Sequence, residues 1–161
     1  MDLDSAPKTL HLDDLNVGDV FLSRAQAVDA QQIVQFASQF DPQPFHLDEE
    51  AAKDTYFQGL AASGWHTAAI TMRLMVESFP LAQGLIGAGV ELSWSQPTRP
   101  GDVLRVKSTI LSITPSRSKP DRAIILFETI TLNQRDEAVQ KLTSRIVAFR
   151  RPQGDALRTP A

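Results

Sequence analysis

Residues 63–79 read Ser-Gly-Trp-His-Thr-Ala-Ala-Ile-Thr-Met-Arg-Leu-Met-Val-Glu-Ser-Phe, the most apolar helical pattern in the chain. Ser63 is a typical N-cap residue and Pro80 follows the stretch, which predicts a helix ending at about Phe79. Its apolar stripe comprises Trp65, Ala68, Ala69, Met72, Met75, Val76 and Phe79, with Ile70 and Leu74 outside it. A helix that is apolar around most of its circumference is normally covered by other elements, so we expect it to be buried.

The second half of the chain predicts strands that can cover this helix. Residues 90–94 alternate between apolar and polar side chains, and residues 103–113, 123–133 and 138–149 are rich in Val, Ile, Thr, Leu and Phe. Short turns separate these stretches, and short connections join antiparallel neighbours. We therefore expect an α+β fold in which a curved antiparallel β-sheet wraps around the long central α-helix.

A further helix is expected before the long one. Asp29 and Gln32 suit a capping box at its start, and its apolar face comprises Ile33, Phe36, Ala37 and Phe40. Pro42 and Pro44 are expected to stop this helix and to leave a stiff loop after it. Asp48 is expected to cap another short helix.

The composition is that of one ordinary globular domain. The chain has 161 residues, of which 42% are hydrophobic and 22% charged, so we expect a single domain over residues 1–161, with an ordered core from about 12 to 150 and loose ends. The net charge of −3 gives no reason to expect nucleic acid as a partner. The absence of cysteine excludes disulfides, thiolate metal sites and a cysteine nucleophile. The start of the chain lacks a signal-peptide pattern, and residues 68–76 are too few to span a bilayer, so we expect a cytoplasmic protein with no membrane partner.

Asp41 and His46 are the first candidates for chemistry. They lie on the proline-stiffened stretch Asp-Pro-Gln-Pro-Phe-His, which can hold both side chains at a fixed separation. A carboxylate and an imidazole are the side chains most often used to move protons near neutral pH. The alternative is that Asp41 makes a turn before Pro42, while His46 is a capping or surface residue. Because a carboxylate beyond a helix C-terminus meets the negative end of the helix dipole, some other contact should hold Asp41 in place.

The start of the long helix is the second candidate site. Its free N–H groups suit an oxyanion, and Gly64 lets a ligand approach the backbone closely. Simple capping by Ser63 explains the same pair without a ligand. His66, in the first turn, either faces the same cavity or hydrogen-bonds within a core turn, and we assign it no catalytic step. Motifs for nucleotide binding, serine hydrolysis and metal ligation are absent from the sequence.

Together these stretches resemble the MaoC-like dehydratases, the (R)-specific enoyl-CoA hydratase branch of the hot-dog fold. The family signature is a helix that ends in Asp-x-Asn-Pro-x-His, followed by a buried helix that a glycine opens. It corresponds to residues 41–46 and 62–67. A later family mark, a proline and then Pro-Gly-Asp before a strand, corresponds to the stretch Pro-Thr-Arg-Pro-Gly-Asp at residues 97–102. The resemblance extends from Leu12 to Phe149 and implies a single hot-dog domain.

The resemblance also implies a hydro-lyase that reversibly hydrates an enoyl-CoA. Asp41 and His46 would deprotonate a water and return a proton to the substrate α-carbon, and the Gly64 N–H would polarise the thioester carbonyl. Gln43 and Ser63 are expected to contact the substrate. The family has asparagine at the position of Gln43 and often histidine at the position of Ser63, so these two residues leave the choice of substrate open. No cofactor is expected, because coenzyme A is part of the acyl-CoA substrate. The implied assembly is a homodimer or higher homo-oligomer with sheets joined edge to edge.

Two other functions fit the same fold. A hot-dog acyl-CoA thioesterase would hydrolyse the thioester, and a non-catalytic module would only bind it. The pair Asp41 and His46 matches the hydratase pattern, and a pure binding module has no need of both side chains. The hydratase therefore ranks first.

Overall fold

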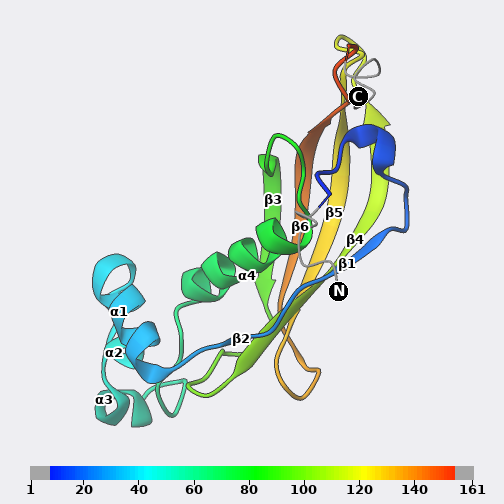
Figure 1. The fold of residues 1–161 in the computed structure, drawn as a ribbon. Coiled ribbons are helices and arrows are strands. Elements are labelled where there is room, and N and C mark those ends of the chain that lie inside the picture. The colour runs from blue at the N-terminus through cyan, green and yellow to red at the C-terminus, as the bar shows by residue number, and fades with distance from the viewer. Residues whose placement is uncertain (1–7, 155–161) are drawn as a thin grey trace.

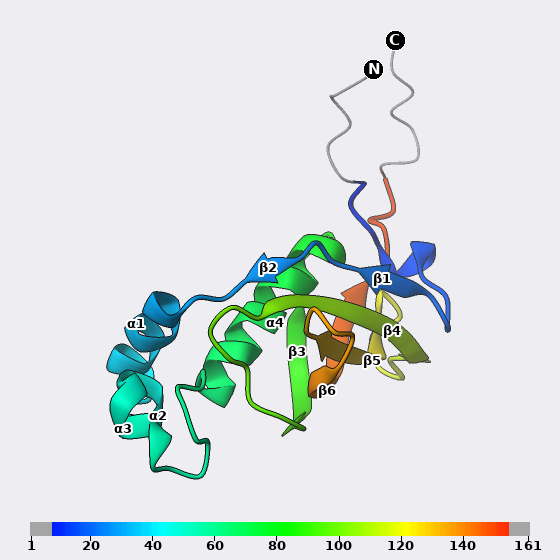
Figure 2. The same ribbon diagram turned by 90° about the horizontal axis from the view of Figure 1, so that it is seen from below.

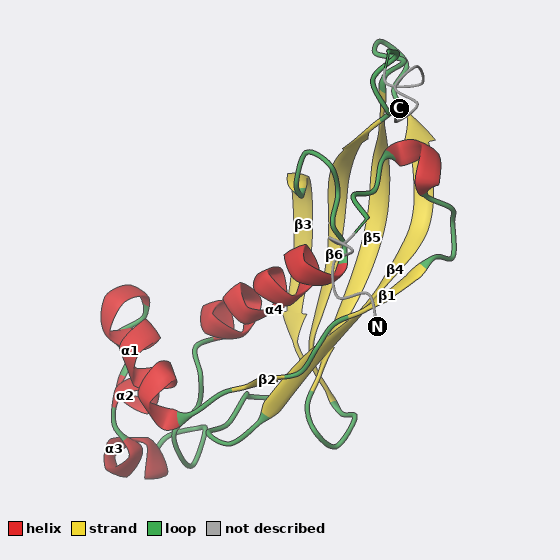
Figure 3. Ribbon diagram, in the orientation of Figure 1, coloured by secondary structure: helices red, strands yellow, loops and turns green. Residues whose placement is uncertain are grey.

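One curved antiparallel sheet and a long helix against its concave face make up the computed structural model, which describes residues 8–154 (Figures 1 and 3). The strands are β1 (Val20–Leu22), β2 (Gln26–Ala27), β3 (Ile86–Trp94), β4 (Val103–Pro115), β5 (Arg122–Leu132) and β6 (Ala138–Phe149). The helices are η1 (Leu12–Asp14), α1 (Ala30–Phe40), α2 (Pro44–Leu47), α3 (Glu49–Lys53) and α4 (Gly64–Ser78). Strand order in the six-stranded sheet is β1-β4-β5-β6-β3, with β2 also paired to β4. The predicted α+β class is confirmed.

The ends of the chain were expected to be loose. Residues 1–7 and 155–161 lie outside the described residues. Within the described part, Leu10 forms an isolated parallel bridge with Leu81, just beyond α4. The bridge ties the chain just before residue 12 to the loop that follows α4.

The sheet follows the period of two that its sequence predicts. Along β5 every second side chain is buried under α4, including Ile125 and Phe127. The edge strand β3 differs, because every residue in it except Leu92 is exposed. β3 also begins at Ile86, before the predicted residue 90. The sequence pattern did not reveal this early part because Gly87 and Gly89 interrupt the alternation, and a β-bulge lies between them.

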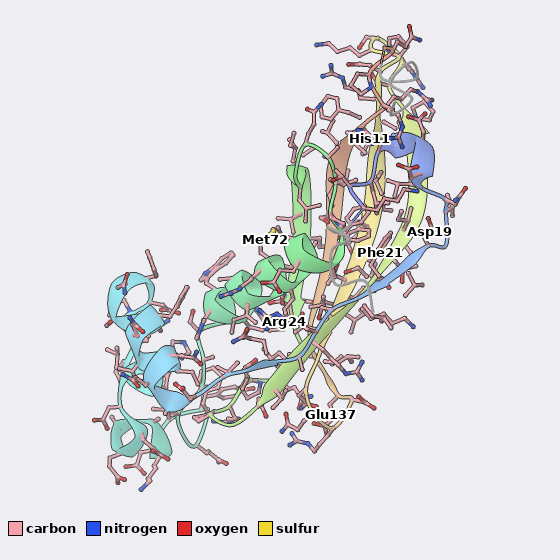
Figure 4. The ribbon with its side chains drawn as sticks, viewed as in Figure 1. His11, Asp19, Phe21, Arg24, Met72 and Glu137 are labelled. Carbon is pink, nitrogen blue, oxygen red and sulfur yellow. The ribbon has the colours of Figure 1, made fainter. Side chains whose placement is uncertain are left out.

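Helix α4 begins after the predicted N-cap Ser63, but its buried face is only partly the predicted one. The buried residues are His66, Thr67, Thr71, Leu74 and Met75. Trp65 and Val76 of the predicted stripe are 62% and 50% exposed. Met72, which Figure 4 labels on α4, is also exposed. Threonines can replace apolar residues here because their hydroxyls are hydrogen-bonded, as between Thr71 and Thr131 at 2.6 Å. Across residues 8–154, neither α4 nor any other helix is long and apolar enough to cross a membrane.

Three phenylalanines fix the C-terminal end of α4 to the sheet. The ring centroids of Phe21 and Phe79 lie 4.5 Å apart, and those of Phe79 and Phe127 lie 4.6 Å apart. Phe21 lies on β1, where Figure 4 labels it. This cluster leaves the opposite, N-terminal end of α4 to form the site.

Helices α1, α2 and α3 gather at that N-terminal end of α4 (Figures 1 and 2). The predicted capping box of Asp29 and Gln32 is present at the start of α1, and Asp48 caps α3 as expected. The prediction of a loop through His46 is wrong, because residues 44–47 form α2. Pro44 occupies the first turn of this helix, where its missing N–H costs no hydrogen bond, so it starts a helix instead of only stopping one.

Candidate active site

Asp41 is the C-cap of α1, and its own backbone N–H donates to the Ala37 carbonyl at 2.9 Å. The Gln43 side-chain amide donates to Asp41 Oδ1 at 2.6 Å. Together with Ser63 and His46, this contact offsets the unfavourable interaction of the carboxylate with the negative end of the helix dipole. The expectation that another contact holds Asp41 is therefore confirmed.

His46 lies on α2 and is only 4% exposed. Its Nδ1 is 2.7 Å from the carbonyl oxygen of Ala61. A carbonyl oxygen can only accept a hydrogen bond, so Nδ1 carries the proton and donates it. The other ring nitrogen, Nε2, then has a free lone pair in the neutral ring, and it faces Asp41 Oδ2 at 3.4 Å. Because 3.4 Å exceeds the usual length of a direct hydrogen bond, this lone pair remains available to a third molecule.

The carboxyl group of Asp41 is held in its ionised form. Burial is the largest influence and by itself raises the pKa of Asp41. Hydrogen bonds from the Ser63 hydroxyl and the Gln43 amide, with a smaller contribution from the neighbouring His46, outweigh it and lower the pKa of Asp41 from 3.8. Asp41 is therefore a carboxylate at neutral pH, and it can accept a proton or a hydrogen bond but cannot donate one.

His46 and Gly64 line one pocket of about 290 Å³ at the N-terminal end of α4. The other lining residues are Tyr56, Phe57, Ala62, Thr67, Trp94, Ser95, Gln96, Pro97 and Thr98. Gly64 is the first residue of α4, so its N–H has no partner inside the helix. A Cβ at this position would lie 2.5 Å from the Trp94 indole, so only glycine fits under that ring. The pocket thus combines an imidazole, a free helix N-terminus and an aromatic wall.

The two remaining predicted site residues contact Asp41 in this structure. Ser63 is fully buried, and its Oγ accepts a hydrogen bond from the Trp65 N–H at 3.2 Å, while its hydroxyl also bonds Asp41. Gln43 is exposed, and its side-chain amide bonds Asp41 Oδ1. Both side chains orient the acid, and a direct contact of either with substrate stays a prediction.

Neither of the two interpretations of His66, facing the cavity at the helix start or hydrogen-bonding within a core turn, is confirmed. Its ring stacks on Phe36 of α1, with centroids 4.7 Å apart and planes 7° from parallel. It lines a different pocket of about 300 Å³ between α1 and α4, together with Gln35 and Arg73 among others. Its Nδ1 has no hydrogen-bond partner among the described residues. Burial lowers the pKa of His66 from 6.5, so the ring is neutral at pH 7.

This neutral, buried His66 predicts an acid-sensitive stability. The unfolded chain binds a proton at His66 below pH 6.5 more readily than the folded chain does, so stability should fall as the pH drops below that value. His66→Phe keeps the stacking on Phe36 and removes the titration. We expect its urea-unfolding midpoint to drop less than that of the unsubstituted chain between neutral pH and about pH 5.5. Parallel pH profiles for the two proteins would contradict this prediction.

Sequence reasoning missed a polar network that supports the aromatic wall. The Trp94 indole N–H donates to Gln140 Oε1 at 2.9 Å, and the Gln140 amide donates to Thr71 Oγ1 at 3.0 Å. Gln140 and Thr71 are fully buried. The only sequence signal was the polar side chains at strand and helix positions that face the core. Over residues 8–154, no three His, Asp or Glu side chains are grouped closely enough to hold a metal ion.

Comparison with known proteins places this geometry among its relatives. The family model described as "MaoC like domain" matches residues 15–124. The chain is 33% identical over 133 residues to the uncharacterized protein YdeM of Bacillus subtilis, covering 81% of this chain and 92% of that one. It is 27% identical over 113 residues to a 3-hydroxybutyryl-CoA dehydratase of Methylorubrum extorquens, covering 70% and 71%. The crystal structure of a MaoC-like dehydratase from Rhodospirillum rubrum superposes with a TM-score of 0.87 at 64% identity, covering 89% and 99% of the two chains.

Proposed function

Because this chain belongs to the family of MaoC-like dehydratases, we propose that it adds water reversibly to an enoyl-CoA, or removes it from a 3-hydroxyacyl-CoA. One observation carries the proposal. The Ala61 carbonyl holds the His46 proton on Nδ1, so Nε2 points its lone pair toward the Asp41 carboxylate and the ring borders the same pocket as Gly64. Such a pair suits the activation of a water beside an electrophile.

In the proposed reaction His46 first accepts a proton and later returns it. A water hydrogen-bonded to both Asp41 and His46 loses a proton to Nε2, and its oxygen forms a bond to the substrate β-carbon. The π electrons of the double bond move to the thioester oxygen, where the Gly64 N–H stabilises the negative charge. The enolate then collapses as the α-carbon takes up the proton, so that one water has been added in total. Dehydration follows the same steps in reverse.

A coupled screen of enoyl-CoA and 3-hydroxyacyl-CoA substrates tests the proposal. Hydration removes the absorbance of the conjugated enoyl thioester, and free thiol can be measured in the same samples. We expect loss of enoyl absorbance without thiol release. Thiol release would instead identify a thioesterase, and binding without either change would identify a non-catalytic module.

We also propose that two chains associate through β3. This strand is an edge of the sheet with exposed residues along almost its whole length, and unpaired edges of this kind favour pairing with another chain. An apolar groove of about 310 Å³ runs beside it, between Trp65 and Met72 of α4 and Val90 of β3. A second copy placed against β3 by two-fold symmetry would cover this groove.

The dimer predicts a specific effect of charge at the strand edge. Val90→Lys should give a monomer with reduced hydration activity, because a lysine in a dry interface costs desolvation energy. Val17→Lys is the matched control, since Val17 is 62% exposed and Val90 is 65% exposed, but Val17 lies in the turn before β1. Sedimentation velocity at micromolar concentration distinguishes the two states. A Val90→Lys protein that sediments like the unsubstituted chain would contradict the proposed interface.

A further inference from the structure

The stretch Pro-Thr-Arg-Pro-Gly-Asp has no part in the proposed reaction, yet its arginine makes an unusual set of contacts. The Arg99 guanidinium donates to three main-chain carbonyls. Its Nη2 bonds the Phe57 oxygen at 2.5 Å, and its Nη1 bonds the Gly59 and Leu60 oxygens at 3.0 and 3.2 Å. Hydrogen bonds from a charged donor are stronger than neutral ones, so Arg99 fixes the backbone of residues 57–60.

The residue that follows this segment is the one that controls His46. Ala61 accepts the His46 Nδ1 proton at 2.7 Å through its carbonyl, and its own N–H donates to the Phe45 carbonyl at 3.1 Å. The next N–H, of Ala62, donates to the Thr98 carbonyl at 2.9 Å, immediately before Arg99. The orientation of the Ala61 carbonyl is therefore set by its neighbours on both sides, and Arg99 holds the side that precedes it.

Arg99 itself stands on a rigid turn. Its backbone N–H donates to Asp102 Oδ2 at 2.8 Å, and the other oxygen of this buried carboxylate accepts from the Gln134 amide at 2.9 Å. Gly101 has a φ of +89°, a conformation that favours glycine, and its N–H donates to the Val28 carbonyl at 2.8 Å. These hydrogen bonds fix the turn, so the Arg99 side chain is held in place against the segment before Ala61.

We infer that Arg99 is a positioning residue: by holding the carbonyls of Phe57, Gly59 and Leu60 it orients the Ala61 carbonyl. That carbonyl keeps the proton of neutral His46 on Nδ1 and leaves Nε2 as the base. The effect on rate rests on the proposed function, whereas the effect on the tautomer does not. Arg99 is absent from the lining of the pocket that His46 and Gly64 share. Its loss should therefore lower kcat more than it raises KM.

The test compares Arg99→Met with the unsubstituted full chain by NMR of the histidine ring nitrogens. The chain has three histidines, so His46 is assigned by its disappearance in His46→Gln. We expect a single Nδ1-protonated tautomer in the unsubstituted protein and a mixture of both tautomers in Arg99→Met. The kcat for hydration should fall about 10- to 100-fold, the range seen when an outer partner of a functional histidine is lost. Arg105→Met is the matched control, because Arg105 is also half-buried and pairs with the surface residue Asp136, far from Ala61 in the chain.

Each outcome decides the inference. A folded Arg99→Met protein with an unchanged His46 tautomer or an unchanged kcat overturns it. If Arg99→Met does not fold, Arg99→Lys, which keeps the charge but cannot reach all three carbonyls, decides by the same two measurements. If the unsubstituted chain hydrates no enoyl-CoA, the proposed function fails, and the tautomer comparison alone still supports or overturns the role of Arg99.

Discussion

Asp41→Asn and His46→Gln are each expected to reduce the kcat for enoyl-CoA hydration by about 10²–10⁴-fold, the contribution usual for general acid–base catalysis. Asparagine keeps the shape of Asp41 but removes the negative charge, and glutamine at position 46 provides no base where Nε2 stands, 3.4 Å from the carboxylate. The measurement is the loss of enoyl absorbance with crotonyl-CoA and with longer or branched enoyl-CoAs.

Two matched substitutions separate chemistry from folding. Asp54→Asn changes an exposed carboxylate just after α3, and His11→Gln changes a histidine at the other end of the fold. Both should keep the full rate, and circular dichroism should show that all four variants are folded. Near-normal rates in folded Asp41→Asn and His46→Gln proteins would remove the proposed mechanism.

Gly64→Ala is expected to have the second-largest effect, on both stability and rate. The added Cβ would lie 2.5, 2.7 and 2.9 Å from three atoms of the Trp94 indole, closer than real contacts allow. Gln140 holds this ring through its N–H, so the ring cannot simply swing away. We expect a loss of about 1–3 kcal/mol in the free energy of unfolding, as for other overpacked sites. Displacement of the helix start should lower kcat by about 10²–10³-fold, the effect of losing one oxyanion donor.

A double-mutant cycle with Trp94→Leu tests whether this clash is the cause. The smaller side chain removes the ring atoms that the Cβ meets, so Gly64→Ala should cost much less stability in the Trp94→Leu background. Equal costs of Gly64→Ala in both backgrounds would rule out the clash, and a Gly64→Ala protein with full activity would argue against the oxyanion role.

The architecture could be predicted from the sequence wherever an element depends on residues that are close together in the chain. The alternation in residues 138–149 gives both ends of β6, and Asp29 with Gln32 marks the start of α1. The buried face of α4 was not readable, because the burial of Thr71 depends on Thr131 and Gln140, 60 and 69 residues away. A threonine counts as polar until its distant partner is known.

The same limit applies to the candidate site, where some residues could be predicted from the sequence and others could not. Asp41, His46 and Gly64 could be proposed because their residue types and spacing form a motif. The Ala61 carbonyl that fixes the His46 ring could not, since every residue carries a carbonyl and sequence gives no sign of its direction. Arg99 stood in a noted motif, but the carbonyls it binds lie about 40 residues earlier in the chain.

The place of β3 at the far edge of the sheet has a consequence for how the chain folds. β3 precedes β4 in sequence, yet among residues 8–154 its only strand partner is β6, which follows the other five strands along the chain. Until residues 138–149 have emerged, β3 has no strand partner in the described part of the chain, and Trp94 lacks the Gln140 side chain that fixes it. Such late, long-range pairing slows folding and leaves an apolar strand open to aggregation. The aromatic wall of the pocket is therefore completed only after β6 has been synthesised and has paired with β3.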